Sequence, residues 1–116
     1  MVMEQRMVGG VAVIDLSGKL ALGDGDGVLR DKVQSLVFQG VKDIALNLGG
    51  LSYMDSAGLG ELISVHSTAT RNGGYIKIFN LTKRVSDLLA ITKVLTVFDV
   101  FDSEQEALES FLAPVS

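Results

Sequence analysis

The stretch that decides the fold spans residues 43–71 and reads DIALNLGGLSYMDSAGLGELISVHSTATR. Its first part, residues 43–48, alternates large apolar residues with smaller or polar ones and is typical of a short β-strand. The glycine pair at residues 49–50 is expected to bend the chain after this strand. The apolar spacing then changes to three and four residues, which predicts a helix from Ser56 to about Arg71. Its inward stripe is expected to contain Leu59, Leu62, Ile63, a partly buried His66, and Ala69 or Thr70.

Similar signals lie on both sides of this unit. Residues 4–8 and 11–17 flank Gly9-Gly10 and predict two antiparallel strands joined by a tight turn. The other predicted elements are a helix from Val28 ending at Gly40, a strand over 75–79, a helix from about Thr82 to Ile91, a strand over 97–101 and a helix opened by Ser103. The order β-β-α-β-α-β-α-β-α predicts an α/β fold with a mixed, mostly parallel sheet of about five strands and about four helices.

Composition limits the classes of function. The chain has 116 residues, 47% of them hydrophobic and 21% charged, which predicts one globular domain over residues 1–116. The net charge is −4 and the largest basic cluster is Lys83-Arg84, which argues against direct binding of nucleic acid. With no cysteine and a single histidine, His66, no metal and no cofactor are expected. Apolar runs are short and no signal-peptide pattern is present, so we expect a cytoplasmic protein without membrane insertion.

Ser56 occupies the position with the most chemical potential. Unpaired backbone N–H groups and aligned peptide dipoles at the start of a helix favour negative charge, so a phosphate on Ser56 would be stabilised there. The small residues Ala57, Gly58 and Gly60 leave room around the hydroxyl for the active site of another protein. The alternative is structural, because Ser56 and Asp55 are both good N-cap residues.

A catalytic nucleophile is the competing chemical interpretation of Ser56. Serine hydrolases of the nucleophile-elbow type need G-x-S-x-G, whereas this chain has M-D-S-A-G, with the charge of Asp55 beside the hydroxyl. His66 follows ten residues later on the same predicted helix, about 15 Å away and out of reach. We therefore expect that the chain is not an enzyme.

The loop GDGDG at residues 23–27 is a second candidate segment. Its spacing fits neither a Walker-type phosphate loop, which needs a following Lys-Ser or Lys-Thr, nor an EF-hand. The structural interpretation is a turn in which Asp26 caps the helix that begins at Val28. The functional interpretation places Asp24 and Asp26 beside Ser56, because loops at the carboxyl ends of strands gather at one edge of an α/β sheet.

The segments LNL at residues 46–48 and MDSAGLG at residues 54–60 resemble the STAS family, the domain shared by anti-sigma-factor antagonists and sulphate transporters. The resemblance covers nearly the whole chain. It implies a STAS fold and an anti-sigma factor antagonist in bacterial partner switching. It also implies that Ser56 is phosphorylated by a partner that is both anti-sigma factor and serine kinase, and that a serine phosphatase resets the switch.

The resemblance further implies a partner-binding surface around Ser56. The residues expected to shape or border it are Asp24, Asp26, Asp55, Ala57, Gly58, Leu59 and Gly60. Many family members carry an acidic residue directly after the Gly-x-Leu segment, where this chain has Ala21. We expect Asp24 or Asp26 to take over that role.

Two other functions stay open on the sequence alone. The first is a non-switching STAS scaffold in a stressosome-like or membrane-transport assembly, in which Ser56 is only a helix cap. The second is small-ligand or hydrolytic activity, which needs a pocket and a base that the sequence does not reveal. Whether the chain forms a homodimer is likewise open.

Overall fold

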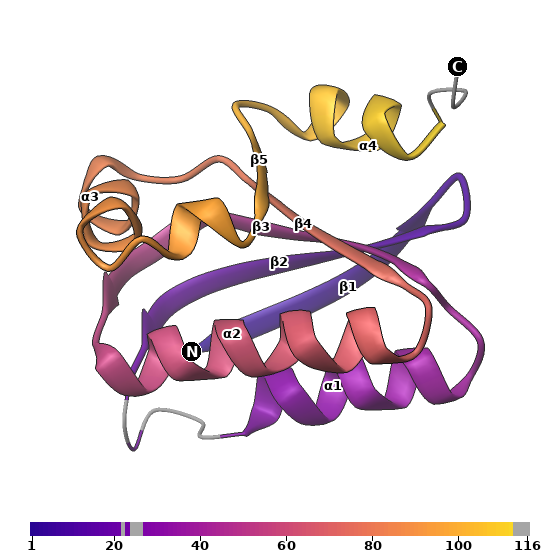
Figure 1. Ribbon diagram of the computed structural model, residues 1–116, viewed down its shortest axis with the longest axis horizontal. Helices are drawn as coiled ribbons and strands as arrows, with labels where there is room; N and C mark the ends of the chain where they lie inside the picture. The colour runs from indigo at the N-terminus through magenta and orange to yellow at the C-terminus, as the bar shows by residue number, and fades with distance from the viewer. Residues whose placement is uncertain (22, 24–26, 113–116) are drawn as a thin grey trace.

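Five strands form one sheet in the computed structural model, which describes residues 1–21, 23 and 27–112. The strands lie side by side in the order in which they follow along the chain (Figure 1). They are β1 (Val2–Val8), β2 (Val11–Leu20), β3 (Asp43–Met54), β4 (Tyr75–Phe79) and β5 (Asp99–Phe101). β1 is antiparallel to β2 and the other neighbouring pairs are parallel, as the element order predicts.

Helices cover both faces of this sheet (Figure 1). α1 (Val28–Phe38) and α2 (Ser56–Arg71) pack against each other on one face, and α4 (Glu104–Leu112) lies on the other. α3 (Lys83–Ile91) and the 3₁₀ helix η1 (Val94–Thr96) connect β4 to β5, and α3 packs against β3. The predicted layered α/β fold is confirmed.

The β1–β2 hairpin turns at Gly9 and Gly10, as the sequence predicts. Their φ angles are 57° and 85°, both in the left-handed region that favours glycine. Two successive residues of this kind are typical of the type I′ turn, whose twist matches that of the paired strands. Val8 and Val11 therefore pair directly on either side of the turn.

β3 is longer than predicted, because the chain does not bend at the glycine pair 49–50. The strand continues to Met54, which pairs with Leu20 at the end of β2. Continuous pairing with β2, with two register irregularities, outweighs the local turn preference of the glycines. Gly50 is needed in this pairing, since a Cβ there would stand 2.6 Å from the Leu16 carbonyl oxygen.

The core has two parts, one on each face of the sheet. The larger part lies between the sheet and helices α1, α2 and α3, with Ile14, Leu46 and Ile78 fully buried. The smaller part lies under α4, where Ala107 packs against Phe79 and residues of β2 and β3. Most of the apolar burial that stabilises the domain is therefore on the α1–α2 face.

The buried face of α2 is rotated about the helix axis relative to the predicted one. Leu59, Leu62, Val65 and Ala69 are buried, whereas Ile63, expected inside, is 42% exposed. His66 is partly buried, as expected, and makes an edge-to-face contact with Phe98 at a centroid distance of 5.0 Å. The buried residues of the helix are spaced by three and four positions, as predicted, but they include Val65 in place of Ile63.

The last strand is shorter than the predicted 97–101 segment. β5 pairs with only three residues of β4, from Lys77 to Phe79. Phe98 precedes the strand and is buried in the larger part of the core instead. After β5, Ser103 Oγ accepts a hydrogen bond from Glu106 N at 3.2 Å, which confirms that Ser103 caps the final helix.

The Arg6 guanidinium joins β1, β2 and α4. Its Nε donates to Asp15 Oδ2 at 2.8 Å, and its Nη1 donates to Glu104 Oε2 at 3.0 Å. Hydrogen bonding to Arg6 lowers the pKa of the Asp15 carboxyl and the pKa of the Glu104 carboxyl. The first turn of α4 is thus attached to the sheet by a charged group shared between two carboxylates.

Replacing Arg6 should make the stability less dependent on pH. Because Asp15 and Glu104 have lowered pKa values in the folded state, their stabilising contribution is complete above about pH 5 and is lost as the pH falls through those lowered values. We expect Arg6→Ala to lower the free energy of unfolding by about 1 kcal/mol at neutral pH, because partly exposed ion pairs contribute little individually. Urea unfolding should show this difference narrowing as the pH is lowered from 5 to 3.

Lys83→Ala is the matched control for this experiment. Lys83 Nζ and Asp87 Oδ2 are 3.2 Å apart, but the two side chains are 90% and 60% exposed. The control should therefore have no measurable effect on stability. An Arg6→Ala difference that is the same at both ends of the pH range would contradict the prediction.

Candidate functional site

The candidate site lies where β3 ends and α2 begins, beside the carboxyl end of β2. Leu20 and Met54, the last residues of β2 and β3, pair with each other. Asp55 then leads into the helix, and its backbone N–H donates to the Leu20 carbonyl at 3.4 Å. The first turn of α2 is thereby positioned against the end of β2, at the edge of the sheet where α/β proteins commonly place functional loops.

Asp55, not Ser56, caps α2. Its backbone is extended, with φ −111° and ψ −172°, and its Oδ1 accepts a hydrogen bond from Gly58 N at 3.0 Å. Ser56 is consequently the first helical residue, and it is exposed. In the described part of the chain its hydroxyl makes no hydrogen bond. The alternative in which Ser56 serves as the helix cap is therefore wrong.

The start of α2 offers backbone donors to an anion. Asp55 uses the N–H groups of Gly58 and Leu59, the latter through its carbonyl oxygen at 2.9 Å. Among the described residues, the N–H groups of Ser56 and Ala57 have no acceptor. The first turn of α2 also contains no acidic side chain, so within this helix the cap carboxylate of Asp55 is the negative charge at the positive end of the helix dipole. A phosphate on Ser56 would meet two unused N–H donors.

Gly58 is small for a structural reason rather than for access. It is buried, and a Cβ on it would stand 1.9 Å from the Leu20 carbonyl oxygen. Leu59 is 9% exposed and belongs to the core. The expectation that the lack of a side chain at Gly58 opens space for a partner is wrong, because that space is filled by the backbone of β2.

Ala57 and Gly60 are exposed, as a partner surface requires. A Cβ on Gly60 would have no atom within 4 Å among the described residues. Ser56, Gly60 and Ile63 lie at positions i, i+4 and i+7 and so share one face of the helix. We call these three residues, with Ala57, the exposed α2 face. Ile63 was assigned to the core by the sequence pattern and is instead an accessible apolar side chain on the same face as Ser56.

Asp24 and Asp26 lie outside the described residues, and their predicted role beside Ser56 stays a prediction. The N-cap position of α1 is held by Gly27, with φ 80° and no side-chain hydrogen bond. Glycine suits this position because its backbone is left-handed. The expectation that Asp26 caps this helix falls on a residue outside the described ones and stays a prediction. Ala21, which directly follows β2, is partly buried.

Glu61 is a part of this region that the sequence did not indicate. Its Oε1 accepts a hydrogen bond from Arg30 N at 3.2 Å, in the first turn of α1. A side chain of α2 thus supplies the capping interaction that Gly27 lacks. The two residues are 31 positions apart, so no local pattern could have paired them. The contact holds the starts of α1 and α2 next to each other.

Metal-ligand groups, membrane-spanning helices and the place of the single histidine were the remaining features that the sequence raised. Among the described residues, no group of three or more His, Cys, Asp and Glu is arranged to hold a metal ion. None of the described helices is long and apolar enough to span a bilayer. His66 packs on Phe98 at the edge of the core, well along the helix from the Ser56 hydroxyl.

Comparison with known proteins identifies the family. The STAS domain profile matches residues 3–107. The chain belongs to the STAS domain family. The STAS resemblance drawn from the sequence is thus confirmed, and the five-stranded mixed sheet with its four α-helices is a single STAS fold.

Named relatives of this STAS chain are anti-sigma factor antagonists. It is 37% identical over 73 residues to the anti-sigma-B factor antagonist of Bacillus subtilis (strain 168). The matched segment is 63% of this chain and 66% of that relative, so the match spans just under two thirds of the relative's length. It is 27% identical over 99 residues, or 85% of each chain, to the anti-sigma F factor antagonist of Paenibacillus polymyxa. The structure of the antagonist SpoIIAA in its unphosphorylated form matches 97% of this chain and all (100%) of that one, with 26% identity and a TM-score of 0.75.

Alanine at Gly58 and at Gly60 should have opposite effects on stability. Gly58→Ala forces a Cβ into the Leu20 carbonyl and should cost about 1–3 kcal/mol, as overpacking does. Gly60→Ala meets no neighbour and should stabilise α2 by up to about 1 kcal/mol through helix propensity. Urea unfolding of both variants measures the difference. Equal effects of the two substitutions would show that the close approach to Leu20 is not a constraint.

Proposed function

We propose that this STAS domain is an anti-sigma factor antagonist whose binding to an anti-sigma factor with serine kinase activity is switched off by phosphorylation of Ser56. A serine phosphatase would restore the binding form. The observation that carries the proposal is that Asp55, and not Ser56, caps the start of α2. Because the Asp55 side chain makes the capping hydrogen bond, the exposed Ser56 hydroxyl is not needed to cap the helix and is accessible to a kinase.

The names of its relatives support this assignment. Two of them are antagonists of anti-sigma factors, and the similar structure of the antagonist SpoIIAA is described as that of its unphosphorylated form. A switch of this kind works where ATP and sigma factors are present, and we therefore propose a cytoplasmic location. The chain itself would act as a binding protein and kinase substrate, not as an enzyme.

The switch would act through charge. A phosphate adds about −1.5 to −2 charges. It would stand on the exposed α2 face next to the Asp55 carboxylate, in a chain whose net charge is already −4. A partner surface complementary to a neutral hydroxyl would be repelled. Because the unused N–H groups of Ser56 and Ala57 favour the phosphate locally, the modification should change the surface and leave the fold intact.

The exposed α2 face would form the centre of the contact. Ala57 and Gly60 allow close approach of a partner backbone, and Ile63 offers an apolar anchor one turn further along. Interfaces gain most of their affinity from a few such buried anchors. Asp24 and Asp26 would border this surface, and Asp55, Gly58 and Leu59 would support it from beneath.

Phosphorylation should be confined to Ser56. Incubation of the chain with its cognate anti-sigma kinase and ATP should add a single phosphate, measured by intact mass, and Ser56→Ala should accept none. Ser52→Ala is the matched control, because Ser52 is also exposed and lies four residues earlier in β3. This control should be phosphorylated like the unmodified chain. Modification of Ser56→Ala at another site would refute the assignment.

Binding should follow the charge at residue 56. In affinity capture from a native lysate, the unmodified chain and Ser56→Ala should retain an ATPase of the histidine-kinase-like class. Ser56→Asp should bind it at least about tenfold more weakly, which corresponds to about 1.4 kcal/mol. Ile63→Ser should weaken binding without changing the response to charge. Equal retention by Ser56→Asp would favour the alternative of a non-switching scaffold.

A further inference from the structure

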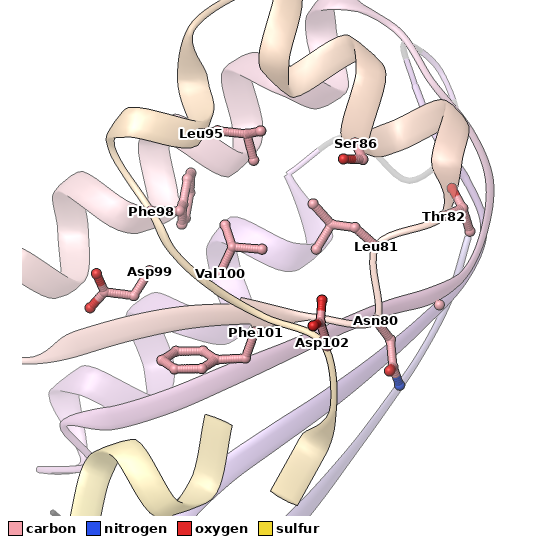
Figure 2. Close-up of a pocket in the computed structure, with 11 residues that line it drawn as sticks. Asn80, Leu81, Thr82, Ser86, Leu95, Phe98, Asp99, Val100, Phe101 and Asp102 are labelled. Atoms are coloured by element: carbon pink, nitrogen blue, oxygen red, sulfur yellow. The ribbon is translucent and has the colours of Figure 1, made fainter. Parts of the chain in front are cut away.

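A hollow of about 710 Å³ lies between β5 and the α3–η1 segment (Figure 2). Its wall is part apolar and part polar, and the apolar part includes Leu81, Leu95, Phe98 and Val100. Figure 2 shows these four side chains around one space, with the Ser86 hydroxyl directed into it from α3. The volume is within the range of sites that bind small organic molecules, about 300–1,000 Å³.

Several apolar side chains around the hollow remain partly accessible to solvent. Val100 is a strand residue on the side of β5 that faces α3, yet it is 39% exposed. Leu81 and Leu95 are only partly buried. Apolar side chains grouped around a concave space indicate a place where an occupant can be bound, whereas scattered exposed ones do not.

The charges around the hollow are of one sign. Asp99 and Asp102 both line it, and the described lining residues include no lysine or arginine. The Asp102 carboxylate points toward Leu81 and the hollow, whereas the Asp99 carboxylate points outward (Figure 2). Within the described residues neither carboxylate has a hydrogen-bond or ion-pair partner. An anionic ligand would therefore be repelled.

Two lysines of the neighbouring elements have partners of their own. Lys83 of α3 pairs with Asp87. Lys77 of β4 lies on the other side of the sheet, where it donates to Ser110 Oγ at 2.8 Å and stands 4.4 Å from the centre of the Phe111 ring. Neither of them neutralises Asp102, so the acidic group beside the apolar wall is available to a cation from outside.

The position of the hollow in the fold is also that of a ligand site. Asn80 and Asp102 line it and are the residues that directly follow β4 and β5. The hollow thus lies at the carboxyl ends of two neighbouring parallel strands, the edge at which α/β sheets gather their functional loops. The sheet topology and the side chains therefore indicate the same place.

We propose that this hollow binds a small organic cation, a protonated amine carried on an apolar group. The ammonium would donate a hydrogen bond to the Asp102 carboxylate. The apolar part would pack against Leu81, Leu95, Phe98 and Val100. This binding is independent of the switch at Ser56, since no residue of α2 lines the hollow.

Titration of the ¹⁵N-labelled full chain with phenethylamine tests the proposal. The amide signals of Leu81, Ser86, Val100 and Asp102 should shift saturably. The neutral analogue 2-phenylethanol should bind about tenfold more weakly, because it lacks the charge-assisted hydrogen bond, and phenylacetate should not bind. Absence of saturable shifts with the amine, or equal binding of the neutral or anionic analogue, would overturn it.

Asp102→Asn should reduce the affinity for phenethylamine to that of the neutral analogue and leave the fold unchanged, because Asp102 is exposed and unpaired in the described structure. Asp31→Asn on α1 is the matched control and should bind the amine as the unmodified chain does. Ser86→Leu fills the hollow and should abolish binding. An Asp102→Asn variant with undiminished affinity would also overturn the proposal, and phosphorylation of Ser56 should be the same in all three variants.

Discussion

The close backbone contact between the first turn of α2 and the end of β2 is the constraint on which the site depends. The Leu20 carbonyl accepts the N–H of Asp55 and occupies the space that a side chain at Gly58 would need. Only glycine allows this approach, and the approach sets the start of the helix at Ser56. Asp55 is then placed to cap, and the serine hydroxyl is left exposed.

The exposed Ser56 hydroxyl is supported from beneath by paired strands and packed helices. The ends of β2 and β3 pair beneath it, and Glu61 of α2 accepts the Arg30 N–H in the first turn of α1. The exposed α2 face is therefore carried by two strands and two helices that hold one another. A phosphate on such a surface changes its charge without the need to move the backbone, which suits a switch that acts by electrostatic repulsion.

The other end of the chain is attached more lightly. β5 pairs with three residues of β4, and α4 contacts the sheet through a small apolar cluster, the Arg6 ion pairs and Lys77 between aromatic rings. The hollow lies between this short strand and the α3–η1 segment, with Val100 in its wall and Asp99 and Asp102 among its lining residues.

The motifs at residues 46–48 and 54–60 carried the resemblance to the STAS family. Local pattern alone determined the order of the elements, the antiparallel hairpin at Gly9 and Gly10, the parallel crossovers and the position of Ser56 at a helix start. These follow from interactions between residues that are near in sequence, such as apolar periodicity, capping and turn conformation. Tertiary structure decided that β3 continues through its glycine pair, that Ile63 faces outward, that Gly58 contacts Leu20 and that Glu61 caps α1. Each of these depends on a partner far along the chain, whose position exists only once the sheet and helices have packed together.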